Sequence, residues 1–377
     1  MEGAKDFVGI GIPFAAGVAA GAVLFPFPYV VHPLHAAVLI ALTGSLGVLA
    51  ARHLDSRTPP SMTVAAVGIL FLLGGLSCSA SSTLSSGIPT WKGPLTSFAA
   101  LCKDSLTARI DSIPYPSPST SSMIKALLTG DRSGLDSKTV ELFRNSGASH
   151  ILALSGLHLG IIYLILSKLT LPLGNSPVAR RMRYSWIVAA SGFYTLMTGA
   201  GPSIVRAFIF IFLHETAKLL GRKASTSRIL LSALTIQLAM EPEVITSTGF
   251  QLSYLAMLGI TLLYPPLRRI YPEATGTLGR LDPMRRIWEA AMLSISCQVF
   301  TAPLAWFRFH TFPRYFLLTN LMVLPLTSAV MVLSVTTTAL SFIGTCPHFL
   351  VVLNDSAVGT MVYCLETISS LQGPSLP

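Results

Sequence analysis

Long apolar runs without a charged residue constrain the fold of this chain more than any other feature of its sequence. Two of these runs cover residues 7–51 and 62–90. A helix needs about 20 apolar residues to cross a bilayer, and only helices and closed barrels satisfy their backbone polar groups in hydrocarbon. Only 11% of the residues are charged and 51% are hydrophobic, whereas soluble domains carry about 25% charged residues. The sequence therefore predicts an all-α polytopic membrane protein.

The apolar runs between charge clusters predict about ten or eleven transmembrane helices. We expect them near 9–29, 34–51, 62–80, 149–169, 184–200, 203–220, 227–241, 249–267, 288–306, 315–343 and 348–368. Two of these runs leave alternatives open. The run 227–241 is short, and 315–343 is long and contains Pro325, so either is compatible with a broken or re-entrant helix.

Lysine and arginine alternate between connections in a way that predicts topology. They occur in the connections 52–57, 168–183, 218–228 and 268–286, and are absent from 30–34, 200–203 and 241–248. Cytoplasmic loops carry this excess of basic residues, so the N-terminus is predicted to be cytoplasmic. Most of the formal net charge of +10 is explained by orientation, and it is not independent evidence for a nucleic-acid partner.

The segment 81–148 is then predicted to lie on the outer face. Phe98–Ile113 and Ser137–Asn145 have the pattern of amphipathic helices, and we expect both along the membrane surface. A Pro-rich stretch, 114–118, reads as an extended linker.

A polar loop at 130–134 is the first candidate site. Gly130, Asp131, Arg132 and Ser133 precede a helix expected to be capped by Asp136 or Ser137. Glycines let backbone N–H groups approach an anion, and a helix N-terminus beside an arginine suits a phosphate. The alternative, a surface turn closed by its own side chains, is favoured because short Gly-Asp turns are common.

A second candidate site lies within the predicted span 149–169, which contains His150, Ser155, Gly156 and His158. Ionisable groups in a span face a cavity or a partner. Ser155 and His158 are three residues apart and are predicted to be neighbours on one helix face, either as a polar lining or as the nucleophile and base of an intramembrane serine hydrolase. The lining is favoured because catalysis also requires an orienting acid.

Further polar groups occur in later spans. Arg206 and Glu215 lie in the run 203–220, and Gln251 and Gln298 lie in the runs 249–267 and 288–306. Arg206 either snorkels or pairs, or it supplies positive charge along an anion pathway, and the sequence does not separate these alternatives. The glutamines either join helices or line the same path.

Motifs for nucleotide or metal chemistry are absent from the sequence. It has no GxxxxGK[ST] loop, no HExxH and no HxHxDH cluster, and its five cysteines show no CxxC spacing. We therefore expect no cofactor, no catalytic metal and no enzymatic activity.

Several short motifs resemble the competence domain of the ComEC family in the family's order. They are GDRSGL at 130–135, the segment from Phe143 to His150, LSGLHLG at 154–160, GAGPS-x-x-RA at 199–207, GFQLS at 249–253 and the stretch from Gln298 to Pro303. The resemblance implies a multi-helix channel that carries single-stranded DNA across the bacterial inner membrane during natural transformation. It also implies that the motif residues Gly130, Asp131, Arg132, His150, Ser155, Gly156, His158, Arg206 and Gln251 matter for that channel.

The resemblance further implies the partners and the domains. Partners would be single-stranded DNA, membrane lipid, an external DNA receptor, and a cytoplasmic ATPase or single-strand-binding proteins. We expect a three-helix membrane segment at 1–80, a reduced OB-like region at 81–120, the channel domain at 121–345, and a hydrophobic helix and tail at 346–377. We expect the chain to lack the family's metallo-β-lactamase-like nuclease domain, so that a separate nuclease would be a further partner. A related transporter or scaffold that has lost DNA uptake is the third alternative.

Overall fold

The fold is described by a computed structural model for residues 12–24, 69, 72, 75, 93–222, 225–272, 282–310 and 314–371. Within these ranges the regular structure is entirely helical, which confirms the all-α prediction. Among the described residues, four helical segments are long and apolar enough to cross a membrane: Gly156–Leu173, Pro283–Phe309, Phe316–Ile343 and His348–Leu371. Two shorter apolar helices cover Thr226–Met240 and Thr248–Leu262. The protein is thus a multi-pass membrane protein. The predicted spans 34–51 and 62–80 fall almost entirely outside the described residues.

The chain divides into two compact units. One comprises residues 1–92 and 209–254, and the other comprises 93–208 and 255–377. In the first unit, α2 (Ile12–Leu24), α12 (Thr226–Met240) and the 3-10 turn η3 (Pro242–Thr246) share an apolar cluster with the start of α13 (Thr248–Leu262). Phe14, Val18, Leu238, Val244 and Phe250 are its buried members.

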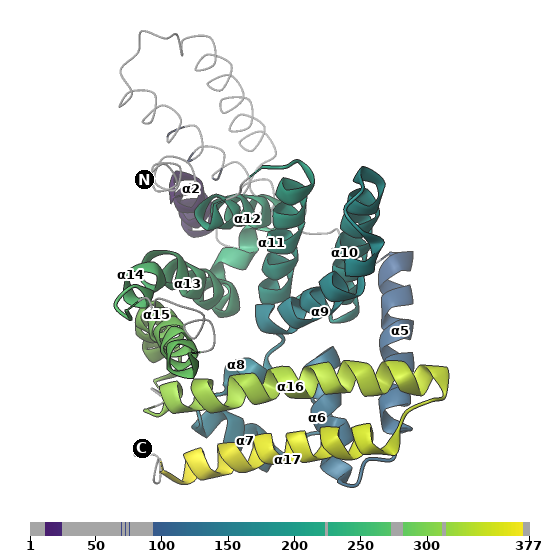
Figure 1. The fold of residues 1–377 in the computed structure, drawn as a ribbon. Coiled ribbons are helices and arrows are strands. Elements are labelled where there is room, and N and C mark those ends of the chain that lie inside the picture. Colours follow the sequence, from purple (N-terminus) through teal and green to yellow (C-terminus); the bar gives the residue numbers. More distant parts are fainter. Residues whose placement is uncertain are drawn as a thin grey trace. The chain divides into compact units, whose positions relative to one another are not determined.

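The second unit is built around the helices α16 (Phe316–Ile343) and α17 (His348–Leu371), which lie side by side as a hairpin (Figure 1). Packed with them are α5 (Pro94–Asp111), α6 (Pro118–Thr129), α7 (Ser137–Asn145) and α8 (Ser149–Leu152). Their buried side chains form one core, which includes Ile124, Leu127, Phe143, Met331 and Met361. The same unit holds α9 (Gly156–Leu169) with the turn η2 (Leu171–Leu173), α10 (Pro177–Met197), α14 (Tyr264–Arg268) and α15 (Pro283–Phe309). Helix α11 (Pro202–Leu219) contributes residues to both units.

Helix α6 was not predicted, because its start resembles a linker. The stretch 114–118 ends in Ser117 as the N-cap and Pro118 as the first helical residue, a position where proline is favoured. Its cap comes from far along the chain. The Asp355 carboxylate on α17 accepts hydrogen bonds from Ser117 N (3.1 Å), Ser117 Oγ (3.1 Å) and Thr120 Oγ1 (2.6 Å). A buried face of four large apolar residues then packs α6 into the core: Met123, Ile124, Leu127 and Leu128.

A buried polar cluster surrounds Asn354, the residue that precedes Asp355 on α17. Asn354 is fully buried, and its Nδ2 donates to Ser334 Oγ at 3.2 Å and to Thr337 Oγ1 and Tyr115 Oη at 3.4 Å. Burying an amide is costly unless its hydrogen bonds are made. These contacts tie the segment before α6 to both helices of the hairpin.

Several predicted helices are confirmed to within a few residues. Helix α5 matches Phe98–Ile113 except that it begins and ends a few residues earlier, and α7 matches Ser137–Asn145 with Asp136 as its cap. The apolar face of α5 is divided, because Ile110 is buried while Phe98 and Leu101 are exposed. Whether α5 and α7 lie on the membrane surface stays a prediction. Helix α16 continues through Pro325 without a break.

Two predicted spans are wrong as single helices. The span 149–169 is interrupted between α8 and α9, where Ala153 has an extended backbone (ψ 124°) and Ser155 is an N-cap. The span 249–267 ends as α13 at Leu262, and a separate short helix, α14, follows with Pro265 and Pro266 in its first turn. Proline supplies no N–H to continue the preceding helix, which accounts for the second interruption.

Replacement of Asp355 by alanine should destabilise the second unit, because it removes the only carboxylate that caps α6 among the described residues. Loss of an N-cap costs about 0.5–2 kcal/mol, and Asp355 serves three donors, so we expect the upper part of that range. Thermal unfolding of the detergent-solubilised chain measures the change. Glu366→Ala, at an exposed position of the same helix, is the matched control. Equal midpoints for the two variants would contradict the capping role.

Candidate functional site

The loop 130–136 connects α6 to α7 through a closed turn. Gly130 ends α6 in the left-handed region at φ +74°, where an added Cβ would collide with the Leu154 side chain. The Asp131 carboxylate accepts a hydrogen bond from Ser133 N at 3.0 Å, and Leu135 N donates to Arg132 O at 3.0 Å. Asp136 Oδ1 then caps α7 by accepting from Thr139 N at 3.2 Å. These are the bonds of the surface turn that the sequence favoured.

The electrostatics of this loop leave a positive charge exposed. Hydrogen bonds from the side chain and the backbone of Ser133 lower the pKa of the Asp131 carboxyl, which keeps it ionised. The N–H of Ser133 is therefore engaged by Asp131 and is not available to a bound anion. Arg132 and Ser133 are exposed. What the loop offers a negatively charged partner is thus the Arg132 guanidinium.

The interruption between α8 and α9 places Ser155 and His158 in contact. Ser155 Oγ lies 3.0 Å from His158 Nδ1 and accepts a hydrogen bond from Leu157 N at 3.3 Å, while Ser155 N donates to the same Nδ1 at 3.3 Å. This is a capping box, in which the cap residue and the third helical residue satisfy each other's backbone groups. The prediction that Ser155 and His158 share one helix face is therefore wrong, since Ser155 lies outside the helix.

These contacts define the state of the His158 ring. Because Nδ1 accepts from the Ser155 N–H, the ring proton belongs on Nε2. His158 is fully buried, and its Nε2 has no hydrogen-bond partner within the described part of the chain. A serine hydrolase needs an acid at this second nitrogen to orient the base, and none of the described residues provides one.

Arg206 of α11 lies against the start of α9. A methyl group on Gly156 would be 3.3 Å from Nη2 of Arg206 and 3.5 Å from Cβ of Ala207, so the absence of a side chain at Gly156 makes room for the guanidinium. Arg206 is only 9% exposed. The Leu154 side chain, beside Gly130, is two residues away along the chain. The structure thus brings Gly130, Ser155, Gly156, His158 and Arg206 into one region.

The remaining candidates have other surroundings. His150, on α8, hydrogen-bonds to the Gly147 backbone and lies close enough to His158 to interact with it electrostatically. Gln298 is half-buried on α15. Glu215 is buried and lies 3.4 Å from Lys218 Nζ, and Gln251 Nε2 donates to Ile245 O at 2.8 Å. The contact of Gln251 holds the turn before α13, which is the structural alternative for this residue. The described residues contain no group of three His, Cys, Asp or Glu side chains arranged to hold a metal ion.

The sequence interpretation missed the polar residues of α17. Asn354 and Asp355 stand together in an otherwise apolar helix, and polar groups in such a position require partners. That signal was present in the sequence and would have singled out both residues. Their partners Ser117, Ser334 and Thr337 are far away in the sequence, so spacing does not reveal them.

Substitution of Gly130 by alanine should destabilise the chain, because the new side chain meets both a left-handed backbone and Leu154. The backbone conformation alone costs about 1–2 kcal/mol for a residue with a Cβ. Gly160→Ala is the control, since a Cβ there has nothing within 4 Å and alanine favours helix. Thermal unfolding midpoints decide the matter, and a Gly130→Ala protein as stable as Gly160→Ala would refute the packing described.

Comparison of the sequence with known proteins identifies a family. The sequence model of the competence protein family matches residues 127–377. ComE operon protein 3 of Bacillus subtilis (strain 168) is 24% identical over 208 residues, which are 55% of this chain and 25% of that protein. YcaI of Escherichia coli (strain K12) is 26% identical over 156 residues, 40% of this chain and 20% of that protein. A protein of Aquifex aeolicus (strain VF5) is 30% identical over 139 residues, 37% of this chain and 32% of that protein.

The matched regions thus span between 20% and 32% of the length of these relatives. No solved structure matches the chain. The family match covers the loop 130–136, the interruption before α9 and every later described helix, which is more than half of the chain. The chain therefore belongs to the competence protein family.

Proposed function

We propose that this protein is a channel of the bacterial inner membrane that passes single-stranded DNA to the cytoplasm during natural transformation. Its N-terminus would be cytoplasmic, and the segment 81–148 would face outward, where an external receptor delivers DNA. A cytoplasmic ATPase or single-strand-binding proteins would draw the strand inward. Degradation of the other strand would fall to a separate nuclease. The domain boundaries at 80, 120 and 345 belong to the same proposal.

One observation carries the proposal: the buried Arg206 at the interruption between α8 and α9. An arginine surrounded by apolar helices costs several kcal/mol unless water or a partner compensates it. A nucleic-acid strand needs positive charge along a polar route, and broken helices line such routes in other membrane transporters. Arg206, beside Gly156 and the Ser155 cap, supplies both features in a family associated with competence.

The exposed Arg132 extends the proposed route. It lies on the loop that begins at Gly130, and Gly130 packs against Leu154 just before the interruption. With the proposed orientation, the strand would meet Arg132 on the outer side before it reaches Arg206. Four residues remain weaker candidates for the route, because each is either partly exposed or contacts residues that are close to it in the sequence: His150, Glu215, Gln251 and Gln298.

The intramembrane hydrolase is a second candidate, favoured by the 3.0 Å contact between Ser155 Oγ and His158 Nδ1. The capping box accounts for that contact without catalysis, and no described acid orients the histidine. We therefore propose no enzymatic role. The third alternative, a scaffold or transporter without DNA uptake, predicts that deletion of the gene leaves transformation unchanged.

Neutralisation of Arg206 should block DNA entry but not DNA binding at the cell surface. In Arg206→Gln cells, labelled DNA that is protected from added nuclease should fall at least about tenfold, which corresponds to about 1.4 kcal/mol in the passage barrier. Arg206→Lys should retain part of the uptake, because it keeps the charge but not the planar guanidinium. Protein level in the membrane is measured in parallel.

Gly156→Ala and Gly160→Ala form a matched pair for the same claim. The first substitution places a methyl group 3.3 Å from the Arg206 guanidinium, and the second has nothing within 4 Å. Only Gly156→Ala should lower uptake. Normal uptake in both Arg206→Gln and Gly156→Ala cells would reject a DNA route past Arg206.

Substitutions of Ser155 distinguish a role as the N-cap of α9 from a role as the nucleophile of a hydrolase. Ser155→Asn keeps an N-cap acceptor without a nucleophile and should retain uptake, whereas Ser155→Ala should lose about 0.5–2 kcal/mol of stability. Thermal unfolding and nuclease-protected DNA are both measured. Loss of function in Ser155→Asn at unchanged stability would favour the hydrolase.

A further inference from the structure

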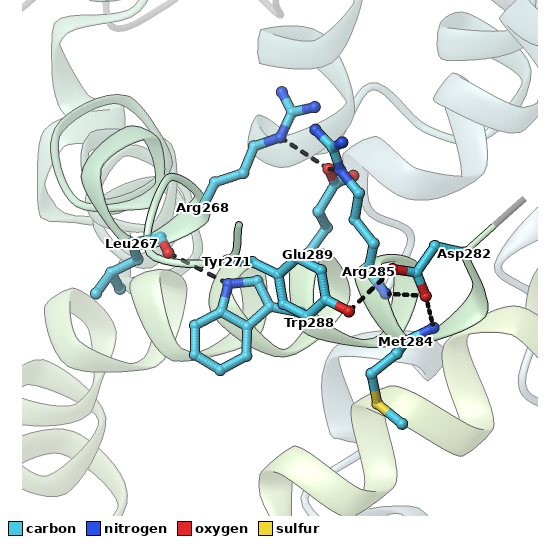
Figure 2. Close-up of polar contacts among 8 residues, drawn as sticks. All are labelled: Leu267, Arg268, Tyr271, Asp282, Met284, Arg285, Trp288 and Glu289. Atoms are coloured by element: carbon cyan, nitrogen blue, oxygen red, sulfur yellow. Dashed lines mark hydrogen bonds and ion pairs between the residues drawn. The ribbon is translucent and has the colours of Figure 1, made fainter. Parts of the chain in front are cut away.

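The corner between α14 and α15 is held together by its own polar contacts (Figure 2). Trp288 Nε1 donates to Leu267 O at 3.3 Å, and the Tyr271 hydroxyl donates to the Asp282 carboxylate at 2.9 Å. Asp282 also caps α15 by accepting from Met284 N at 2.9 Å and from Arg285 N at 3.3 Å. The end of α14 is thereby fixed against the start of α15.

The described residues of this corner include more basic side chains than acidic side chains to pair with them. Glu289 accepts from Arg268 Nε at 2.9 Å and from Arg285 Nε at 3.2 Å, so one carboxylate serves two guanidinium groups. Arg269 and Arg286 are exposed, and neither forms an ion pair with any described residue. The described part of the corner thus contains four arginines but only two carboxylates, those of Asp282 and Glu289.

The position of these charges is not explained by helix stability. The helix dipole favours acidic residues in the first turn, but the first turn of α15 contains no acidic residue and includes Arg285 and Arg286. Asp282, before the helix, offsets part of this repulsion. An external anion at Arg286 and Arg269 would offset the rest.

Large apolar side chains are exposed beside the same arginines. Ile270 is 63% exposed, Met284 is 58% exposed and Ile287 is 51% exposed. Pro283–Phe309 is long and apolar enough to cross a membrane, so its first turns belong near the bilayer surface. Tyr271 and Trp288 are the residue types that gather at that level. At a bilayer surface, the exposed apolar side chains would contact the lipid hydrocarbon, and the adjacent unpaired basic side chains would contact negatively charged headgroups.

We propose that Arg269 and Arg286, together with Ile270, Met284 and Ile287, form a binding surface for the headgroups of anionic phospholipids. A nucleic-acid strand fits this surface less well, because it needs open aromatic faces for its bases. Tyr271 and Trp288 are half-buried, and their polar atoms are used within the corner. The inference does not depend on the proposed DNA channel.

Native mass spectrometry of the full chain tests this surface. The protein, purified in a neutral detergent, is titrated with phosphatidylglycerol and separately with phosphatidylcholine. The wild type should retain phosphatidylglycerol preferentially. The double variant Arg269→Gln/Arg286→Gln should bind it about thirtyfold more weakly, since each charge near a membrane contributes about fivefold. Arg308→Gln, exposed on the same helix at its other end, should bind as the wild type does.

Three outcomes would overturn the proposal. They are equal retention of the two lipids, unchanged phosphatidylglycerol binding in the double variant, and an equal loss in Arg308→Gln. Binding of a labelled single-stranded oligonucleotide is measured with the same proteins. If the double variant loses oligonucleotide binding while lipid binding stays intact, the surface is a nucleic-acid site and the lipid assignment fails. Thermal unfolding in phosphatidylcholine micelles verifies that each variant is folded.

Discussion

Capping of helix ends inside the bundle is the constraint on which the second unit depends. The start of every helix leaves backbone N–H groups without intrahelical partners, and these groups need other acceptors where helices pack together. Helix α6 solves this through Asp355, which reaches its first residues from α17. Helix α9 solves it locally through Ser155 and His158. The first cap holds α6 in the core with α16 and α17, and the second allows the chain to break before α9.

That break gives the candidate site its geometry. Because α9 begins at Gly156 and does not continue from α8, a residue without a side chain faces Arg206 at the helix start. A continuous helix would have placed Ser155 on a packed face with His158. The interruption therefore converts a Ser/His pair that resembles a catalytic motif into a structural cap beside a buried cation. This arrangement underlies the proposal that Arg206, and not the Ser155–His158 pair, is the functional group of the region.

Much of the fold could be predicted from the sequence, because apolar runs set helix positions with little help from distant residues. The cap of α7 by Asp136 and the bounds of α16 follow from local signals of this kind. Helix α6 was missed, since its Pro-rich start also fits a linker. The break before α9 was missed as well, because LALSG is apolar and contains no proline, although a serine followed by glycine signals a cap.

Contacts between residues far apart in the sequence could not be predicted, for a different reason. Asp355 and Ser117, or Arg206 and Gly156, are joined only by the packing of separate helices, and no spacing rule connects them. The motif residues could be singled out by their polarity and by their resemblance to a family. Their roles required the contacts, which place Ser155 and Gln251 in structural hydrogen bonds and Arg206 in a buried position against Gly156.

The most direct measurement is an experimental structure of the full chain in a lipid nanodisc with a bound single-stranded oligonucleotide. The account predicts a phosphate oxygen within about 3.5 Å of the Arg206 guanidinium, with the strand passing Gly156. A strand bound elsewhere, with Arg206 enclosed by protein and no phosphate near it, would contradict the central claim.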